Sequence, residues 1–479
     1  MKEITKNYLY NVSYQILNII LPLITIPYLS RVIGPEMLGK YSYTQSIAYY
    51  FVVIAMLGLN NYGNKTIASV KDNNKILSKT FLSIYVIQLI SSLIVIFFYI
   101  LFIFFTKDES LLLIIWLIYV CSTAFDINWF YFGLEKFKLT VVRNMIIKVI
   151  SVLLIFLFVH SKEDVWVYAL ITALSALISQ AVLWVTIKKY ITFSLVKFIE
   201  VKKHVLPIIT LFIPVIAVSI YTIMDKIMLG KLSGMEETGY FDSAQRIMIV
   251  PTSLITALGT VMLPRISNLI AKNETSKINL LISNSMLYSS VTSIAISSGL
   301  AAISPIFTPI FFGKNFIPTS DIMIILSISV IFIAWANVIR TQYLIPNNYV
   351  NVYIISVIIG ALVNLIANLL LIPSLGAKGA AIGTVIAEFT VMIYQMWVVR
   401  LQLKISSYLK DSIPFFVIGV AMFFLVRLIG QYFGTTVVSL IIQIVVGFLF
   451  YLSLSAIYFL LNKEKLEMIK YKKRSEIDK

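Results

Sequence analysis

Charged side chains interrupt several long apolar segments of this sequence. They are the residues in those segments that could bind a charged ligand or carry a proton. The embedded basic residues are Lys148, Lys226, Arg246 and Arg427, and the embedded acids are Asp126, Asp225 and Glu388. A charge at membrane depth is costly, so it normally faces other protein or a water-filled cavity. These positions are therefore the first candidates for a functional site.

Two interpretations compete for each of these charges. A basic side chain near a helix end can simply extend to the membrane surface. This account suits the arginines at or near the ends of apolar segments, which are Arg31, Arg143, Arg340 and Arg427. It is weaker for Lys148 and Glu388, which lie two or more turns inside their segments.

Asp225 and Lys226 are adjacent, so on a helix they point about 100° apart and do not simply face each other. At least one of them is expected to find a partner on another helix. Arg246, on the following apolar segment, is a candidate partner for Asp225.

The embedded charge is basic on balance. A cation-conducting path is expected to carry rings of carboxylates, whereas Arg and Lys bind phosphate through charge-assisted hydrogen bonds. We therefore predict a positively charged lumen for an anionic substrate. Its candidate residues are Lys148, Lys226, Arg246, Arg31, Arg340 and Arg427, and Asp126, Asp225 and Glu388 are candidates for ion coupling or for structural pairing.

Catalysis and cofactor binding are not indicated. The chain has one cysteine and two distant histidines, so neither an internal disulfide nor a metal site is expected. The Gly-Lys pairs are never followed by Ser or Thr, which excludes a P-loop. A net charge of +17 would suggest nucleic acid in a soluble protein, but here the basic residues lie mainly between apolar segments, and no nucleic-acid partner is expected. We expect no cofactor and no enzymatic activity.

The elements that position these charges are transmembrane helices. The chain is 59% hydrophobic and 13% charged, whereas a soluble domain is about 45–50% apolar and about 25% charged. A spanning helix needs about 20 apolar residues. We predict an all-α polytopic membrane protein with about 14 spans, at 10–30, 42–63, 81–105, 111–132, 141–160, 165–187, 205–230, 241–263, 280–312, 320–344, 351–373, 379–400, 412–430 and 436–461. The ninth carries Pro305 and Pro309 and is expected to bend or end early.

The basic residues are unevenly distributed between the two sets of loops. With the N-terminus inside, 28 of the 39 Lys and Arg residues fall on the inner side and 7 on the outer side. An excess of Lys and Arg marks the cytoplasmic side of a membrane protein. The split predicts an even number of spans and two cytoplasmic termini.

Two segments 200 residues apart resemble each other. Residues 39–47 read GKYSYTQSI and residues 239–247 read GYFDSAQRI, so Gly39 matches Gly239. The alternative is chance similarity between apolar segments. The offset matches the first span with the seventh, which begins on the same side, and this predicts two parallel six-helix repeats with a cavity between them. The predicted parts are an N-terminal six-helix lobe at 1–200, a C-terminal six-helix lobe at 201–404, two extra transmembrane helices at 405–461 and a basic cytoplasmic tail at 462–479.

Four stretches carry a resemblance to a known family. They are KNYLYNVSYQILNIILPLITIPYLSRVIGPEMLGKYSY (6–43), NWFYFGLEKFKLTVVRN (128–144), VMLPRIS (261–267) and GAKGAAIGTVIAE (376–388). Over nearly its whole length the chain resembles the O-antigen and capsular-polysaccharide flippases (Wzx-type) of the MOP superfamily, which also contains the MATE exporters. The first two stretches are the more specific to the polysaccharide branch.

The resemblance implies two six-helix lobes around a cationic cavity, two peripheral helices and alternating access. The implied activity is flipping of an undecaprenyl-pyrophosphate-linked oligosaccharide across the bacterial cytoplasmic membrane for cell-surface polysaccharide biosynthesis. Implied partners are this lipid-linked substrate, membrane lipids, and a polysaccharide polymerase with its export machinery. Capsule, O-antigen, exopolysaccharide and teichoic-acid precursors all fit. The family has no strictly fixed set of functional residues, so none is carried over.

Two other functions compete with this one. A MATE-type exporter of small organic molecules would be expected to show a deep carboxylate cluster in its N-terminal half, but Asp126 stands alone there. A membrane polymerase or ligase would be expected to carry its chemistry on a large outer loop, and the predicted outer loops are only several residues long.

The charge split generates a test of topology. In a Cys121→Ala background, a cysteine introduced at Lys197 should resist a membrane-impermeant maleimide in intact cells, because that loop is predicted to be cytoplasmic. A cysteine at Lys314, in a predicted outer loop, is the matched control and should react. Labelling of the cysteine at position 197 from outside would overturn the orientation.

Overall fold

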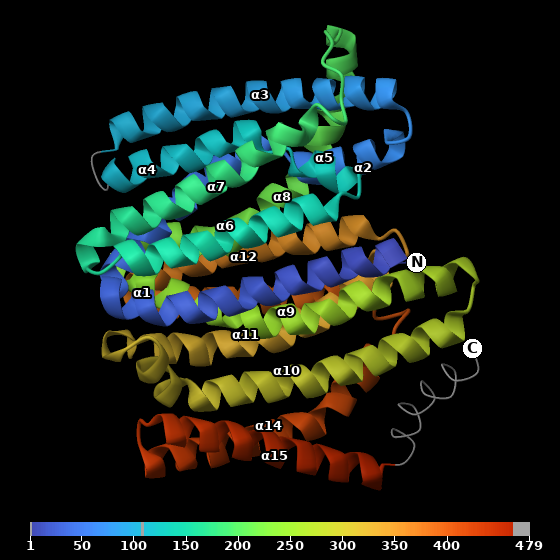
Figure 1. Cartoon of the computed structure of the whole chain (residues 1–479). Coiled ribbons are helices and arrows are strands. Elements are labelled where there is room, and N and C mark those ends of the chain that lie inside the picture. Colours follow the sequence, from blue (N-terminus) through green and yellow to red (C-terminus); the bar gives the residue numbers. More distant parts are fainter. Residues whose placement is uncertain (1, 107–109, 463–479) are drawn as a thin grey trace. The chain divides into compact units, whose positions relative to one another are not determined.

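The computed structural model describes residues 2–106 and 110–462, and every regular element in those ranges is helical (Figure 1). The chain divides into two compact units, Met1–Gly239 and Tyr240–Lys479. The first unit holds α1 Lys2–Met56, α2 Leu59–Val70, α3 Asn74–Phe105, α4 Ser110–Cys121, η1 Ser122–Phe125, α5 Asn128–Gly133, α6 Phe137–Phe158, η2 Lys162–Asp164, α7 Val165–Ile187 and α8 Phe198–Leu232. The second holds most of α9 Met235–Ala271, then α10 Thr275–Phe311, η3 Lys314–Phe316, α11 Thr319–Ile339, the π-helical η4 Arg340–Leu344, α12 Val350–Leu375, α13 Ala377–Val398, α14 Ile405–Phe433 and α15 Val437–Leu461.

The predicted all-α membrane fold is confirmed. In the described ranges, 13 stretches are long and apolar enough to cross a membrane. The first of them, Ile20–Val70, contains a bend at Gly34 that divides α1 into two arms, and counting those arms separately gives the 14 spans predicted. α10 runs through Pro305 and Pro309 to Phe311, so the ninth span does not end early.

The boundary between the compact units lies later than the predicted boundary between lobes. α8, the seventh span, packs against α1, α2 and α3 and so belongs to the first unit. The six-helix lobes 1–200 and 201–404 stay a prediction, as does the role of residues 405–461 outside them. Of the predicted basic tail, 463–479 lies outside the described residues.

Burial is distributed as expected for helices surrounded by lipid. α3 presents one continuous apolar face outward, formed by Ile90, Leu93, Ile94, Phe97 and Phe98. α10 instead buries a row of small polar side chains, which are Ser285, Ser289, Ser293 and Ser297. Lipid chains are as apolar as leucine, so helices associate through small residues and interhelical hydrogen bonds instead. α10 packs through its buried faces against α11, α14 and α15.

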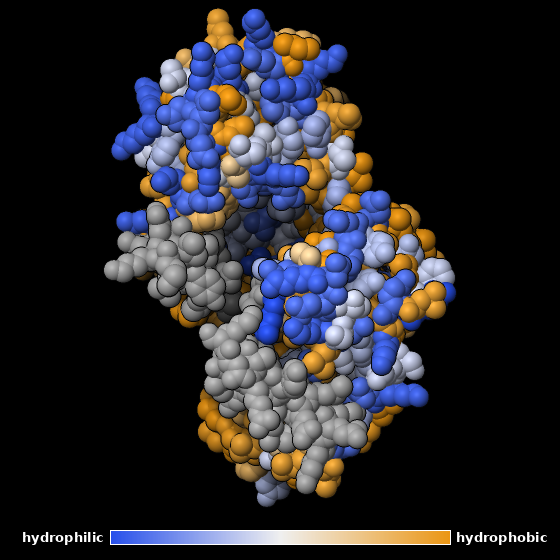
Figure 2. All heavy atoms as spheres, turned by 90° about the vertical axis from the view of Figure 1, so that its right-hand side faces the viewer, coloured by the Kyte–Doolittle hydropathy of each residue, from blue (hydrophilic) through white to orange (hydrophobic). Residues whose placement is uncertain are grey.

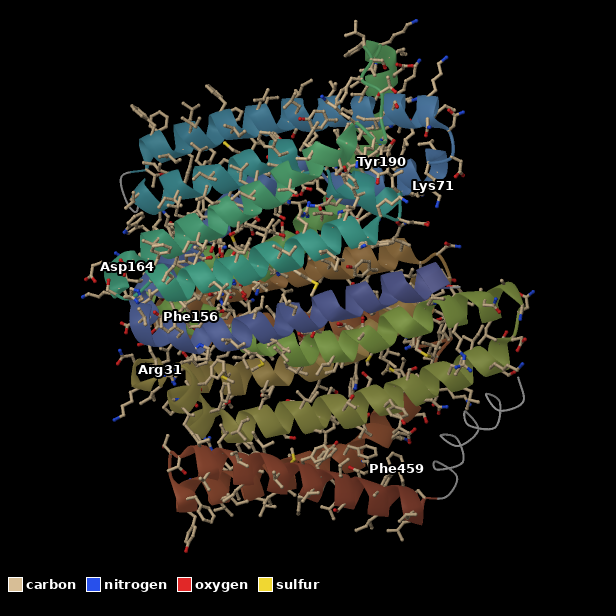
Figure 3. The ribbon with its side chains drawn as sticks, viewed as in Figure 1. Arg31, Lys71, Phe156, Asp164, Tyr190 and Phe459 are labelled. Carbon is tan, nitrogen blue, oxygen red and sulfur yellow. The ribbon has the colours of Figure 1, made fainter. Side chains whose placement is uncertain are left out.

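Polar side chains gather at the ends of the helices. Figure 3 shows Arg31, Phe156 and Asp164 at one end of the first unit and Lys71 and Tyr190 at the opposite end. The view onto the end that carries Lys71 and Tyr190 shows many hydrophilic side chains, with hydrophobic ones along the margins (Figure 2). This arrangement suits helices that cross a membrane with their ends in water.

A short amphipathic helix lies at the Lys71 end of the first unit. The chain turns at Gly58 (φ 76°), and α2 then buries Leu59 and Ile67 and packs on α5. Beyond its end, the ammonium of Lys71 lies 2.9 Å from the carboxylate of Glu135. The hydrogen bond to Glu135 raises the pKa of Lys71. Since Glu135 is exposed, this pair adds little stability.

The two repeated segments begin with the same turn. Gly34 and Gly234 are also 200 residues apart, and both have a positive φ, 80° and 99°. Glu36 and Glu236 follow at equivalent positions. A left-handed φ is nearly free of steric cost only for glycine. The resemblance between the segments therefore starts at Gly34 and Gly234, five residues before the stretch that the sequence comparison identified.

The matching glycines of the two segments contact each other. A Cβ on Gly39 would overlap the backbone carbonyl of Met235, and a Cβ on Gly239 would overlap the backbone carbonyl of Pro35. Pro35 and Met235 each lie four residues before their own glycine, so the two contacts are reciprocal. Reciprocal contacts of this kind are the mark of a twofold relation between two segments. The same relation for the remaining helices of the repeats stays a prediction.

This contact generates a stability prediction. Gly39→Ala should lower the free energy of unfolding by about 1–3 kcal/mol, because the added methyl group overlaps the backbone carbonyl of Met235, which cannot rotate away as a side chain could. Thermal unfolding of the purified protein in detergent would measure it. Gly299→Ala is the matched control, since a Cβ there meets only the terminal methyl of Met422 at 3.8 Å. Equal melting temperatures for the two variants would contradict the close contact.

Candidate functional site

The most extensive buried polar network in the described part of the first unit forms around the break in the fourth span. That span is interrupted between η1 and α5, where Asp126 adopts an extended conformation. Asn128 closes the break, because its backbone N–H and its side-chain amide both donate to Oδ1 of Asp126, at 3.0 and 2.8 Å. The carboxylate of Asp126 is thus held by hydrogen bonds at the point where the helix is interrupted.

The same asparagine links three spans. Its Nδ2 donates to Oε1 of Gln180 on α7 at 2.7 Å, and its Oδ1 accepts from Nη2 of Arg143 on α6 at 3.0 Å. Arg143 also donates to Oδ1 of Asn144 at 2.8 Å, which accepts in turn from Ser179 at 2.8 Å. Arg143 is only 8% exposed, so it does not extend to the membrane surface as the simpler interpretation held. Asn128, Arg143 and Asn144 belong to the stretch 128–144, and the network explains why that stretch combines them.

Gln88 of α3 completes the network from the other side. Its Nε2 donates to the carbonyl oxygens of Thr123 and Asp126, both at 2.7 Å, and its Oε1 accepts from the indole of Trp129 at 2.8 Å. Gln88 is fully buried. The sequence analysis did not identify it, because a single glutamine within an apolar helix gives no signal of its partners.

Arg246 has a carboxylate partner that the sequence analysis missed. Its Nε lies 2.7 Å from Oδ2 of Asp242, one turn earlier on α9. Asp242 is buried, whereas the side chain of Arg246 is 29% exposed. The spacing of four residues was the available signal. The contact of Arg246 with Asp225, which lies in the other unit, stays a prediction.

On α8, Asp225 is fully buried and its neighbour Lys226 is half-buried. This difference follows from the angle between adjacent positions on a helix. α1 packs against α8 near this point, where the hydroxyl of Tyr50 donates to the carbonyl of Ser219 at 3.2 Å. Because Asp225 is buried, a bulky substrate cannot reach its carboxyl group.

Two basic candidates of the first unit lie on its surface. Lys148 is exposed on α6. Arg31 is exposed near the end of the first arm of α1, and its Nη1 donates to the carbonyl of Pro27 at 2.9 Å. The position of Arg31 at the end of the helices agrees with the simpler interpretation of a surface arginine (Figure 3). That Lys148 faces an interlobe cavity stays a prediction.

The two other basic candidates of the second unit, Arg340 and Arg427, are half-buried. Nη2 of Arg340 donates to Oδ1 of Asn337 at 2.7 Å, and its guanidinium lies 5.4 Å from the ring centroid of Tyr353. Arg340 is also the first residue of the π-helical turn η4, a kind of irregularity that is frequent at functional sites. Arg427 lies over the ring of Phe423 at 5.9 Å.

Glu388 is buried on α13, a helix that packs against α11 and α12. Asn364 and Asn368 are buried one turn apart on α12, and a Cβ on Gly383 of α13 would meet the amide of Asn368. The amide of Asn368 thus lies at the contact between α12 and α13, and it donates to Oδ1 of Asn364 at 3.2 Å. The four-residue spacing of the asparagines was visible in the sequence, but their contact with α13 was not.

Comparison with known proteins shows which family this chain belongs to. A family model described as "Polysaccharide biosynthesis protein" matches residues 4–270, more than half of the chain. The chain belongs to this family. A second family model, described as "Lipid II flippase MurJ", matches residues 147–459 of the chain. Together they confirm the predicted membership in the polysaccharide flippases of the MOP superfamily.

Individual relatives agree with the family assignment. The chain is 28% identical over 312 residues to a Shigella dysenteriae protein named "Putative O-antigen transporter", covering 62% of this chain and 75% of the relative. Its fold matches a structure of lipid II flippase MurJ in an inward closed conformation, with a TM-score of 0.77, 20% identity and coverage of 94% and 99% of the two chains. A MATE-family multidrug transporter in an inward-facing conformation matches with a TM-score of 0.56, 14% identity and coverage of 82% and 99%. The two family models and the transmembrane helices make the chain a multi-pass membrane transport protein and not an enzyme.

The network around Asn128 generates a prediction. Asn128→Ala removes three side-chain hydrogen bonds, two of which join other helices. At roughly 0.6 kcal/mol for each interhelical bond in a membrane protein, the loss of these two should cost about 1 kcal/mol. Unfolding in mixed micelles would measure the loss. Asn64→Ala, at an exposed position on α2, is the matched control and should change stability little. If both variants unfold alike, the network does not stabilise the unit.

Proposed function

We propose that this protein flips a polyprenyl-pyrophosphate-linked oligosaccharide, of the undecaprenyl type, from the inner to the outer leaflet of the bacterial cytoplasmic membrane. Its membership in the polysaccharide biosynthesis family is the observation that carries the proposal. The names of its relatives, an O-antigen transporter and a lipid II flippase, support a lipid-linked saccharide as cargo. The glycan can be an O-antigen, capsule, exopolysaccharide or teichoic-acid precursor.

The accessibility of the embedded charges supports an anionic cargo. The acids Asp225, Asp242 and Glu388 are all buried. The basic candidates all keep part of their surface accessible, and they are Arg31, Lys148, Lys226, Arg246, Arg340 and Arg427. The charge available to a ligand is therefore mainly positive, which suits a pyrophosphate. An exporter of organic cations would need accessible carboxylates, so this difference disfavours the MATE-type alternative.

The mechanism we propose is alternating access between two six-helix lobes. Lys148, on the predicted cytoplasmic side, receives the pyrophosphate, and Lys226 with Arg246 holds it when the cavity opens outward. The lipid chain stays in the bilayer throughout. A ligand shifts a conformational equilibrium only by its differential affinity for the two states, so each basic group binds only moderately and releases the cargo.

The buried acids have a separate place in this proposal. Asp126 is fixed by Asn128 and has a structural role. Asp225 and Glu388 are the candidates for proton or sodium coupling, because protonation of a buried carboxyl changes the cost of its burial. A polysaccharide polymerase and its export machinery are the partners that would use the flipped product.

Complementation of a flippase-deficient strain tests the cationic residues. Lys148→Ala, Lys226→Ala and Arg246→Ala should each reduce polymer export several-fold at normal protein levels, because each removes a charge that binds pyrophosphate. Arg246→Lys should be milder, since it keeps the charge. Lys314→Ala, at an exposed loop position, is the matched control and should export normally.

Full export by all three alanine variants would refute the roles of these residues. Loss of the protein itself in Arg246→Ala and Asp242→Ala together would show instead that this pair is structural.

A further inference from the structure

A groove on the surface of the first unit lies between α6 and α7. Its volume is about 470 Å³, and it is separate from the residues assigned above to substrate binding. The walls are apolar, with Val142, Ile146 and Ile147 on α6 and Ile178 and Val182 on α7. Ile146, Ile178 and Val182 are about half exposed, so the structure leaves the groove open along one side. Such a lining fits a hydrocarbon chain.

One end of the groove is basic. Lys138 and Thr186 line it there, beside the first turn of α6 and the last turn of α7. Lys188 and Lys189 follow directly after α7, at the end of the unit where Tyr190 lies (Figure 3). All three lysines are exposed, and none forms a salt bridge with another described residue. The groove therefore combines an apolar slot with Lys138 in its wall, and two further lysines follow in sequence just after α7.

The length of the groove identifies its occupant. From Lys138 to Ile147 the helix rises about 14 Å at 1.5 Å per residue. The hydrocarbon core of a bilayer is about 30 Å thick, so the groove reaches about as deep as one leaflet. This depth suits the acyl chain of a membrane phospholipid, whereas a polyprenyl carrier chain is much longer.

We propose that this groove binds an anionic phospholipid of the cytoplasmic leaflet. One acyl chain lies between α6 and α7, and the phosphate is held by Lys138 with Lys188 and Lys189. Basic sites between transmembrane helices on the cytoplasmic side are suited to anionic lipid head groups. Arg143 forms part of the groove wall and is bonded to Asn128 and Asn144, so the lipid lies directly beside the polar network of the unit. The proposal depends on the predicted orientation of the chain and not on its cargo.

Native mass spectrometry of the full-length protein tests this site. The protein would be titrated in detergent with phosphatidylglycerol and with phosphatidylcholine of identical acyl chains. The parent protein should bind phosphatidylglycerol more tightly. Lys138→Ala should weaken that binding about fivefold, and the Lys188→Ala/Lys189→Ala double variant by more, because each lysine near a lipid phosphate contributes about that factor. Phosphatidylcholine binding should change less.

Two further variants make the test specific. Val182→Trp fills the apolar slot and should reduce binding of both lipids, while its melting temperature shows whether it folds. Lys75→Ala removes an exposed lysine at the same end of the unit that does not line the groove, and it should leave binding unchanged.

Equal affinity for the two lipids in the parent protein would overturn the proposal, as would a Lys138→Ala variant that behaves like Lys75→Ala. Preferential displacement of phosphatidylglycerol by undecaprenyl phosphate, abolished by Lys138→Ala, would also overturn it and would assign the groove to the carrier lipid.

Discussion

The absence of water from the hydrocarbon core of a membrane governs this structure. A polar group there must find its partner within the protein. The backbone meets this requirement by remaining helical. Where the fourth span breaks at Asp126, the carboxylate of Asp126 accepts from the backbone N–H of Asn128, and the side chain of Gln88 donates to the carbonyl oxygens of Thr123 and Asp126. The buried serines of α10 and the pair of Arg246 with Asp242 obey the same constraint. Charged residues make up only 13% of this chain, and the partners of its buried polar groups influence how its helices pack.

The constraint also separates the two signs of charge. Acids at membrane depth are buried or hydrogen-bonded, whereas the basic side chains other than Arg143, being longer, keep part of their surface accessible. The protein thus retains structural carboxylates and still presents positive charge to a ligand. This separation connects the packing of the helices with the proposed transport of a pyrophosphate-linked cargo, and it distinguishes the chain from a carrier of cations.

The sequence predicted the spans well, because twenty apolar residues in succession admit few alternatives in a membrane protein. It did not predict the reciprocal contact of Gly39 with Gly239, although the resemblance of their segments was visible, since sequence similarity does not show that two segments touch. The partner of Arg246 was missed for a different reason: attention to depth favoured Asp225 over Asp242, which lies one turn away on the same helix. Arg143 was read as a surface arginine because only the tertiary fold brings the amide of Asn128, fifteen residues earlier, within hydrogen-bond distance of it.

Transport by the purified protein is the most direct test of the account. The protein would be reconstituted into liposomes with a fluorescent undecaprenyl-pyrophosphate oligosaccharide, and dithionite would be added to bleach the probe in the outer leaflet only. The account predicts that liposomes containing the protein lose nearly all fluorescence, whereas protein-free liposomes keep about half, because only the protein exchanges the probe between leaflets. Identical bleaching in both preparations, while the same protein transports an organic cation, would contradict the account.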